Sequence, residues 1–278
     1  MRRGFSLPAI PALFLLVSLV LVPLLLLLFW SLRTGIGPGS SWTLAHLQQI
    51  WQKPLYLQLL KKSFLTASAV TLLTVLLAWP AAWALARHFT RAQAFLLTLA
   101  LVPYLTSYLL LIYAMMVLLA QGGPLMTLLS WLHLAGLESS ILYTPWATIL
   151  MLVYENVPIM LLVLFSASQR IDPRLLEAAQ ILGAGPLQRF FHVIFPLSLP
   201  GLLAGMVLVF VPVAGSFVEA QILGGPRGLL LGNVIADQVS RIYRPTMGAA
   251  LSLLLLASVL LFTGVIHFLS RRRTAYEI

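Results

Sequence analysis

The segment Asp172–Pro200, DPRLLEAAQILGAGPLQRFFHVIFPLSLP, lies between two long apolar stretches and sets the organisation of the chain. Asp172 and Pro173 form a pair typical of a helix start, in which the acid caps the N-terminus and the proline takes the first helical position. Gly183 stands where this helix would end, because glycine adopts the left-handed backbone conformation without strain. The sequence therefore predicts a short helix followed by a sharp turn.

A second short helix is predicted from Gly185-Pro186 onward. Each of the two helices has about ten residues and a length of roughly 15 Å, half of the ~30 Å hydrocarbon core of a bilayer. Because neither helix can cross, we expect a hairpin at the membrane surface whose exposed face docks onto a partner. A solvated hairpin without a partner is the alternative interpretation. The apolar residues of the second helix recur at i, i+3, i+4 and i+7, on one helical face: Leu187, Phe190, Phe191 and Ile194.

The composition is that of a polytopic membrane protein. Of 278 residues, 60% are hydrophobic and 9% are charged, whereas about a quarter of the residues in soluble domains are charged. The net charge of +10 is explained by basic loops that flank membrane spans, so we expect no nucleic-acid partner. We predict an all-α membrane protein with six transmembrane helices, at about residues 8–32, 62–86, 94–120, 145–169, 199–222 and 246–269.

The distribution of Lys and Arg predicts the orientation in the membrane. With both termini in the cytoplasm, the inner segments hold ten of the 17 basic residues, and the longer outer segments hold the other seven. Cytoplasmic loops are usually the more basic ones. The hairpin at Asp172–Pro200 is then expected on the cytoplasmic side.

The sequence has no recognisable catalytic, nucleotide or metal site. A P-loop requires G-x4-G-K-[ST], and none of the three lysines, Lys53, Lys61 and Lys62, has this setting. There is no cysteine and no H-E-x-x-H pair, so the usual zinc patterns are missing. We therefore expect no cofactor, no metal and no enzymatic activity, so that any ATP driving the protein is hydrolysed by another chain.

Acidic residues within the apolar stretches are the informative polar groups. Glu155 lies near the middle of the fourth predicted span, where a charge costs roughly 2.5–3.5 kcal/mol, and Glu219 lies near the outer end of the fifth. Glu155 has two interpretations: it contacts a cation, or it is a neutral group that bridges two helices. Tyr104 and Tyr108, on the third span, offer aromatic faces for cation–π contacts. No buried Arg is available for an anion.

The hairpin carries a further pattern. Glu177-Ala178-Ala179 is followed after three residues by Gly183, and after nine more by Val193-Ile194-Phe195-Pro196. This spacing resembles the EAA motif, E-A-A-x3-G-x9-I-x-L-P, of the membrane subunits of binding-protein-dependent ABC importers. In that family the segment is the coupling helix, which sits in a cleft of a cytoplasmic ATPase. The resemblance implies an ATPase-coupling role for Glu177, Ala178, Ala179, Gly183 and Pro196.

Other segments resemble the permeases of spermidine/putrescine-type importers, and the likeness runs over most of residues 60–270. Gln221 stands where those permeases carry an acid, with Glu219 two positions earlier. Together with the acids and tyrosines above, this predicts a substrate path lined by Glu155, Glu219, Tyr104, Tyr108 and Gln221. The segments that carry the likeness are Pro103-Tyr104, Val209–Pro212, Gly224-Gly225-Pro226, Leu231–Ile235 and Gly248–Ala250.

The resemblance implies a type I ABC importer permease with a MetI-like transmembrane domain in the bacterial cytoplasmic (inner) membrane. Its implied partners are a dimer of ATP-binding subunits, a second permease subunit and an extracytoplasmic solute-binding protein. We expect a small organic cation, similar to a polyamine, as the solute. The predicted domains are an N-terminal helix and outer loop at 1–60, the importer core at 61–270 and a basic tail at 271–278. An ion-coupled secondary transporter that uses Glu155 is the alternative function.

Overall fold

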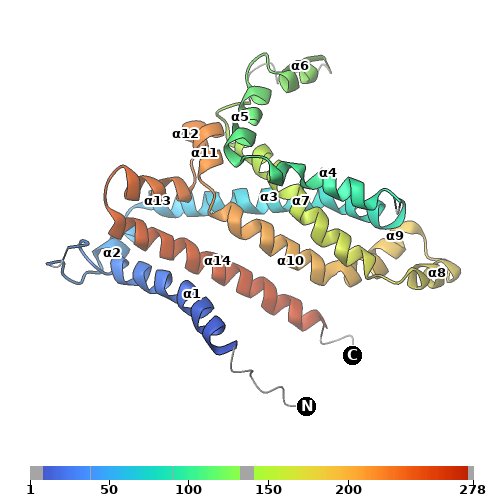
Figure 1. Cartoon of the computed structure of the whole chain (residues 1–278), viewed down its shortest axis with the longest axis horizontal. Helices are drawn as coiled ribbons and strands as arrows, with labels where there is room; N and C mark the ends of the chain where they lie inside the picture. The colour runs from blue at the N-terminus through green and yellow to red at the C-terminus, as the bar shows by residue number, and fades with distance from the viewer. Residues whose placement is uncertain (1–8, 38, 90, 132–140, 275–278) are drawn as a thin grey trace. The chain divides into compact units, whose positions relative to one another are not determined.

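The protein is built from helices (Figure 1). The structure, a computed structural model, describes residues 9–37, 39–89, 91–131 and 141–274. Within these ranges the extended structure is limited to one backbone bridge, between Arg33 and Trp42. The chain divides into two compact units, one formed by residues 1–58 with 234–258 and the other by residues 59–233 with 259–278.

In the first unit, cation–π contacts and backbone hydrogen bonds hold the segments that connect the helices. Between α1 and α2 the Arg33 guanidinium lies 4.7 Å from the ring centre of Phe29 and 5.6 Å from that of Trp42, which are cation–π contacts. Between α13 and α14 the Arg244 N–H donates to the Gln238 carbonyl at 2.7 Å. The unit contains α1 (Ala9–Ser31), α2 (Ala45–Gln52), the start of α3 (Pro54–Arg87), most of α13 (Leu231–Ser240) and the first half of α14 (Pro245–Thr274).

The second unit holds all the residues predicted to have a function. Long helices α3, α7 and α10 run lengthwise, with the short helices α8 and α9 at one end and α11 and α12 at the other (Figure 1). Besides most of α3, it contains α4 (Gln93–Leu105), α5 (Tyr108–Leu119), α6 (Pro124–Trp131), α7 (Pro145–Gln169), α8 (Pro173–Ile181), α9 (Pro186–Arg189), the π-helix η1 (Phe190–Ile194), α10 (Phe195–Ala214), α11 (Val218–Leu223) and α12 (Gly225–Gly228).

Six helical segments in the described part of the chain are long and apolar enough to cross a membrane, as predicted. Their bounds differ from the predicted ones at several ends. The second span begins at Pro54 instead of residue 62, because α3 includes residues 54–61, which the sequence analysis assigns to the preceding loop. The six segments are Phe14–Ser31, Pro54–Arg87, Tyr108–Leu128, Pro145–Gln169, Pro186–Ala214 and Pro245–Ile266.

The predicted third span at 94–120 is not one helix. It is divided into α4 and α5 at Thr106, whose backbone is extended, and Ser107. Pro103 lies in the last turn of α4 and cannot donate a backbone hydrogen bond. Thr106 closes the broken end: its N–H donates to the Pro103 carbonyl at 3.3 Å and its hydroxyl to the Val102 carbonyl at 3.2 Å. The prediction failed because apolarity runs unbroken through this interruption.

The predicted second helix of the hairpin is not a separate short helix either. Residues from Pro186 run without interruption through η1 into α10, so they form the start of the fifth span. Pro196 lacks an N–H, and the π-helix just before it accommodates the altered ladder, with the Phe195 N–H donating to the Phe190 carbonyl five residues back. At its far end this span stops at Ala214 instead of residue 222, and Glu219 lies on the separate helix α11.

Small residues allow α7 and α10 to pack closely. Gly201 and Gly205 are four residues apart on α10, the small-xxx-small spacing that lets membrane helices approach each other. A methyl group added at Gly201 would lie 2.5 Å from the Ala167 Cβ, and one at Gly205 would lie 2.8 Å from the Met160 sulfur. The backbone of α10 therefore lies against side chains of α7. A larger residue at Gly201 would overlap the short side chain of Ala167, whereas one at Gly205 would require Met160 to move.

We expect Gly201→Leu to destabilise the protein, because its side chain would overlap α7 and overpacking costs about 1–3 kcal/mol. The measurement is the thermal midpoint of unfolding in detergent. Gly264→Leu is the matched control, since a Cβ at Gly264 meets no atom within 4 Å. Equal midpoints for the two variants would contradict the close packing of α7 on α10.

Candidate functional site

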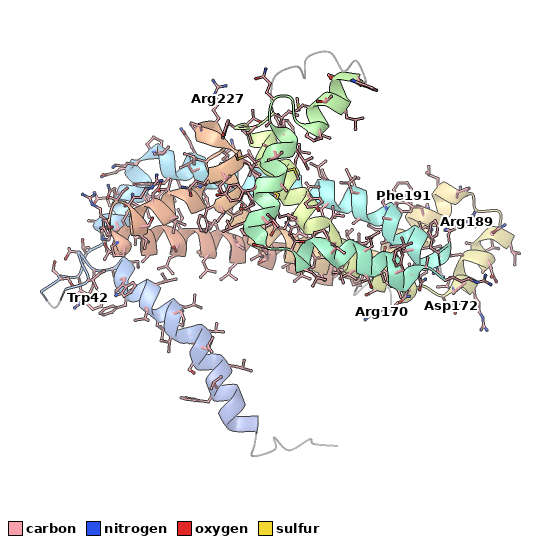
Figure 2. All side chains as sticks on the ribbon, turned by 45° about the horizontal axis from the view of Figure 1, so that its top comes forward. Trp42, Arg170, Asp172, Arg189, Phe191 and Arg227 are labelled. Carbon is pink, nitrogen blue, oxygen red and sulfur yellow. The ribbon has the colours of Figure 1, made fainter. Side chains whose placement is uncertain are left out.

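The predicted functional residues form two groups at different places in the second unit. One group lies on the α8–α9 hairpin, where Arg170, Asp172 and Arg189 gather (Figure 2). The other group lies where α4, α5, α7 and α11 meet, and Arg227, on α12, lies far from the hairpin in the same view.

The start and the turn of the hairpin have the predicted local structure. Asp172 caps α8 by accepting the Arg174 N–H at 2.9 Å, and Pro173 takes the first helical position. Gly183 has a φ of +83°, the left-handed conformation. The Ala184 N–H then donates to the Ala179 carbonyl at 2.9 Å, which closes the end of the helix.

The hairpin exposes apolar side chains around its turn. Ile181 and Leu182 are each 87% exposed and Leu187 is 72% exposed, although all three are large and apolar. Glu177 and Ala178 are exposed on α8, whereas Ala179 of the same helix is half-buried. Ile181 and Leu182 lie outside the candidate spans, and an exposed apolar surface there with an acid beside it is typical of a protein–protein interface. Pro196 is half-buried near the start of α10 and is not part of this surface.

Arg87 anchors the hairpin, and sequence reasoning assigned it no structural role. One amino group of its guanidinium donates to the Ile171 carbonyl at 2.6 Å and to the Ser168 carbonyl at 3.3 Å. These carbonyls lie at the C-terminal end of α7 and just before α8, where the regular intrahelical hydrogen bonds come to an end. The guanidinium also lies 5.1 Å from the ring centre of Trp83. The only sequence signal was an arginine at the end of an apolar span.

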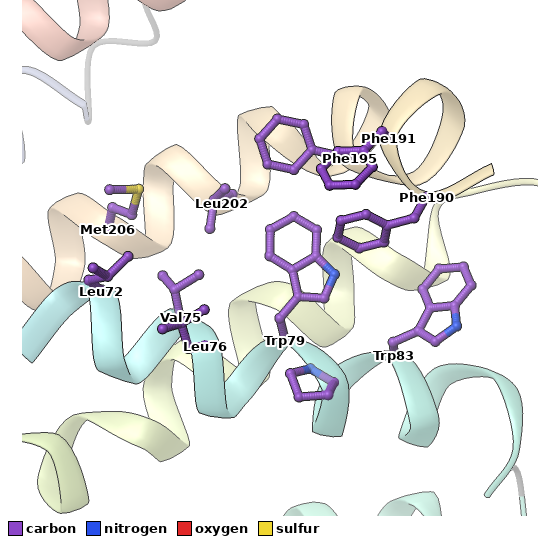
Figure 3. A pocket seen from close by; sticks show the side chains of 11 residues that line it. Leu72, Val75, Leu76, Trp79, Trp83, Phe190, Phe191, Phe195, Leu202 and Met206 are labelled. Carbon is purple, nitrogen blue, oxygen red and sulfur yellow. The ribbon is translucent and has the colours of Figure 1, made fainter. Parts of the chain in front are cut away.

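Aromatic residues join the hairpin to α3. Trp79 stacks on Phe195 with ring centres 5.7 Å apart and an interplanar angle of 13°, and its ring centre is also 5.7 Å from that of Phe190. These rings border an apolar pocket of about 650 Å³ between α3 and the η1–α10 segment (Figure 3). The start of the fifth span is thus fixed to α3 by ring contacts on one side of the hairpin.

The second group contains two acids that interact directly. Glu155, half-buried on α7, and Glu219, 3% exposed on α11, are close enough for their carboxyl groups to interact with each other. Tyr108, at the start of α5, interacts with Glu219, and Tyr104, at the end of α4, lies within electrostatic range of Glu155. Each acid has one carboxyl oxygen that is buried without a hydrogen-bond partner among the described residues.

A pocket of about 120 Å³ lies at the break between α4 and α5. Glu155, Tyr104 and Tyr108 line it together with Pro103, Thr106 and Leu111. The C-terminal end of a helix carries partial negative charge, and here the end of α4 borders the pocket. Carboxylates, carbonyl dipoles and aromatic faces all favour a positively charged ligand over a negative one.

Gln221 is not brought into this group. It lies two residues after Glu219 on α11, and because successive residues of a helix are about 100° apart, it is exposed where Glu219 is buried. It does not line the pocket. Among the residues that the structure describes, no cluster of three or more His, Asp and Glu side chains has the arrangement of a metal site.

Comparison with known proteins gives consistent matches. The family described as "Binding-protein-dependent transport system inner membrane component" matches residues 75–275. The chain is 40% identical over 202 residues to the spermidine/putrescine transport system permease protein PotB of Escherichia coli (strain K12), covering 73% of this chain and 74% of that protein. It is 37% identical over 252 residues to PotB of Haemophilus influenzae (strain ATCC 51907 / DSM 11121 / KW20 / Rd), covering 89% and 88%.

Solved structures give the same fold. A bacterial alginate ABC transporter, in complex with an alginate pentasaccharide-bound periplasmic protein, contains a chain that superimposes with a TM-score of 0.74. The match covers 96% of this chain and 93% of that one, at 17% sequence identity. At this identity the likeness concerns the fold alone.

We expect Gly183→Val to loosen the hairpin, because a β-branched residue at a φ of +83° is strained by about 1–3 kcal/mol. Hydrogen exchange of the α8 and α9 amides measures the effect, and exchange in α7 should stay unchanged. Gly185→Val is the matched control, since Gly185 has an ordinary φ of −68° and free space around it. Equal exchange in both variants would show that the turn does not depend on Gly183.

Proposed function

The chain belongs to the family of inner membrane components of binding-protein-dependent transport systems, and from this premise we propose that it carries a polyamine-like cation through an ABC importer. It is a multi-pass inner-membrane permease, a type of subunit that is not itself an enzyme. In this proposal residues 61–270 form the importer core, residues 1–60 an N-terminal addition and residues 271–278 a cytoplasmic tail.

The observation that carries the substrate is the paired acids at the pocket. Two carboxyl groups in an apolar environment repel each other when both are ionised, and a cation between them removes this repulsion. Tyr104 and Tyr108 add aromatic faces, each worth about 0.5–2 kcal/mol to a bound cation. The two PotB relatives, named for spermidine and putrescine, support an alkylammonium solute of that kind. Gln221, which is exposed, belongs to the proposed path outside this pocket.

The hairpin supplies the proposed coupling to ATP hydrolysis. Its exposed apolar residues, Ile181, Leu182 and Leu187, would be covered by the cytoplasmic ATPase, with Glu177 and Ala178 in the same contact. Ala179 and Gly183 shape the turn, and Pro196 sets the direction of the following span. The full proposed assembly has two ATP-binding subunits, a second permease subunit and an extracytoplasmic solute-binding protein. Closure of the ATPases would move the hairpin and open the path alternately to the two sides.

A secondary transporter driven by an ion at Glu155 is not favoured. It would explain one buried acid, but it requires neither the hairpin nor the apolar surface at Ile181 and Leu182. The family to which the chain belongs consists of components of binding-protein-dependent transport systems, which also speaks against a secondary transporter.

The proposed orientation places both termini and the hairpin in the cytoplasm. The chain has no cysteine, so single cysteines can be labelled selectively. We expect Ile242→Cys, in the α13–α14 turn, to react with an impermeant thiol reagent in spheroplasts, and Gln188→Cys, on α9, to react only after the membrane is opened. Both positions are exposed, so access alone does not explain a difference. The reverse labelling pattern would overturn the orientation.

For the substrate, we expect Glu219→Gln and Glu155→Gln each to lower kcat/KM for spermidine or putrescine uptake by about tenfold or more, because a bond to a charged group contributes about 1.5–3 kcal/mol. Uptake is measured in proteoliposomes that contain the permease, its ATPase and its binding protein. Basal ATP hydrolysis should be retained.

Asp237→Asn is the matched control for this experiment. It makes the same carboxyl-to-amide change at an acid that is paired on the surface with Arg241, at 3.4 Å. Unchanged uptake of both cations in the Glu155→Gln, Glu219→Gln double variant would refute the acid pair as the cation site.

A further inference from the structure

Helix α11, which carries Glu219, has only six residues. A helix of this length is not stable by itself, so its position depends on contacts with other elements. Its C-terminal end is held by the Tyr143 N–H, which donates to the Leu223 carbonyl at 2.8 Å. Side chains from other elements hold its N-terminal end and the loop between α12 and α13.

Asn233 hydrogen-bonds both to the loop between α12 and α13 and to the residue before α11. Its side-chain oxygen accepts the Leu230 N–H at 2.9 Å, and its side-chain amide donates to the Phe217 carbonyl at 2.8 Å. Phe217 is the residue directly before α11, two positions from Glu219. Asn233 is only 3% exposed, so neither bond competes with bulk water.

Lys62 and Ser63 on α3 hydrogen-bond to the loop between α12 and α13 and to the first residue of α13. The Ser63 hydroxyl accepts the Leu231 N–H at 3.0 Å. The Lys62 ammonium donates to the Leu229 carbonyl at 2.9 Å and also to the Arg227 carbonyl. Hydrogen bonds from a charged donor are stronger than those between neutral groups. The side chain of Lys62 thus binds backbone, and it forms no salt bridge with a carboxylate of the described residues.

Close backbone contacts complete the attachment. A Cβ at Gly232 would lie 2.7 Å from the Ser216 carbonyl oxygen and 2.9 Å from that of Gly215, so the start of α13 rests directly on the backbone that precedes α11. Side chains of α3 and Asn233 of α13 therefore fix both the loop and the residues that lead into α11.

We propose that Lys62, Ser63 and Asn233 form a clamp that positions Glu219 against Glu155, and that Lys62 and Asn233 are positioning residues of the cation site. When both acids are ionised, their repulsion would push α11 away from α7, and the clamp opposes that movement. The transport part of this inference rests on the proposed function, whereas the structural part does not.

The structural part is tested by cysteine protection. Ala220, the neighbour of Glu219, is fully buried, so a cysteine there should react slowly with a thiol reagent. We expect Lys62→Met to raise the labelling rate of Ala220→Cys at least about tenfold, because loosening α11 exposes it more often. Lys61→Met is the matched control, since Lys61 is the adjacent lysine and is exposed. Equal rates in the Lys62 and Lys61 variants would overturn the clamp.

Asn233→Asp provides an independent variant if Lys62→Met does not fold. Aspartate keeps an oxygen for the Leu230 N–H but loses the amide that donates to the Phe217 carbonyl. It should also raise the labelling of Ala220→Cys. Lys62→Arg keeps a charged donor for the two carbonyls and should restore protection. Protection that is equal in Asn233→Asp and wild type, or no rescue by arginine, counts against the proposal.

The transport part is tested by combining variants. Lys62→Met should raise KM for putrescine uptake in proteoliposomes more than it lowers kcat. In the Glu219→Gln background the same change should have little further effect, because the positioned carboxylate is already gone. Additive losses would show that Lys62 acts only on general stability. If Glu219→Gln alone has no effect on uptake, the proposed cation site fails, and the cysteine labelling still decides whether the clamp exists.

Discussion

Hydrogen bonding of the backbone inside the membrane is the constraint on which this structure depends. A bilayer offers no water to the N–H and C=O groups that a broken helix leaves free, so each interruption needs a protein partner. The partners are polar side chains at two breaks, Thr106 at the end of α4 and Asn233 before α11. Arg87 binds backbone in the same way where α7 ends at the hairpin.

These interruptions also create the geometry of the candidate cation site. The break between α4 and α5 brings Tyr104 and Tyr108 to one pocket, and the stop after Ala214 lets α11 turn Glu219 toward Glu155. An uninterrupted fifth span would have carried Glu219 past that position. The cost of breaking a helix in lipid is thus offset by side chains that also fix the geometry of the candidate site.

The hairpin and the acid pair are connected by two of the long helices. Helix α7 carries Glu155 and ends at the carbonyls bound by Arg87, directly before α8. Helix α10 begins in the hairpin through η1 and ends just before α11. Both helices pack on each other through Gly201 and Gly205, which leaves little room for independent movement. In the proposed mechanism, these two packed helices would carry a displacement of the hairpin to the two acids.

The helical membrane class, the number of spans and the start of the hairpin follow from the sequence alone, because these depend on apolar length and on the local chemistry of Asp172, Pro173 and Gly183. It also indicated the acids, since a charge in an apolar stretch is costly wherever it lies. The positions of the helix breaks, the meeting of Glu155 with Glu219 while Gln221 faces away, and the bonds of Lys62 and Asn233 to the backbone around α11 required the folded structure. Those features depend on contacts between residues up to 168 positions apart, which hydropathy and local spacing do not contain.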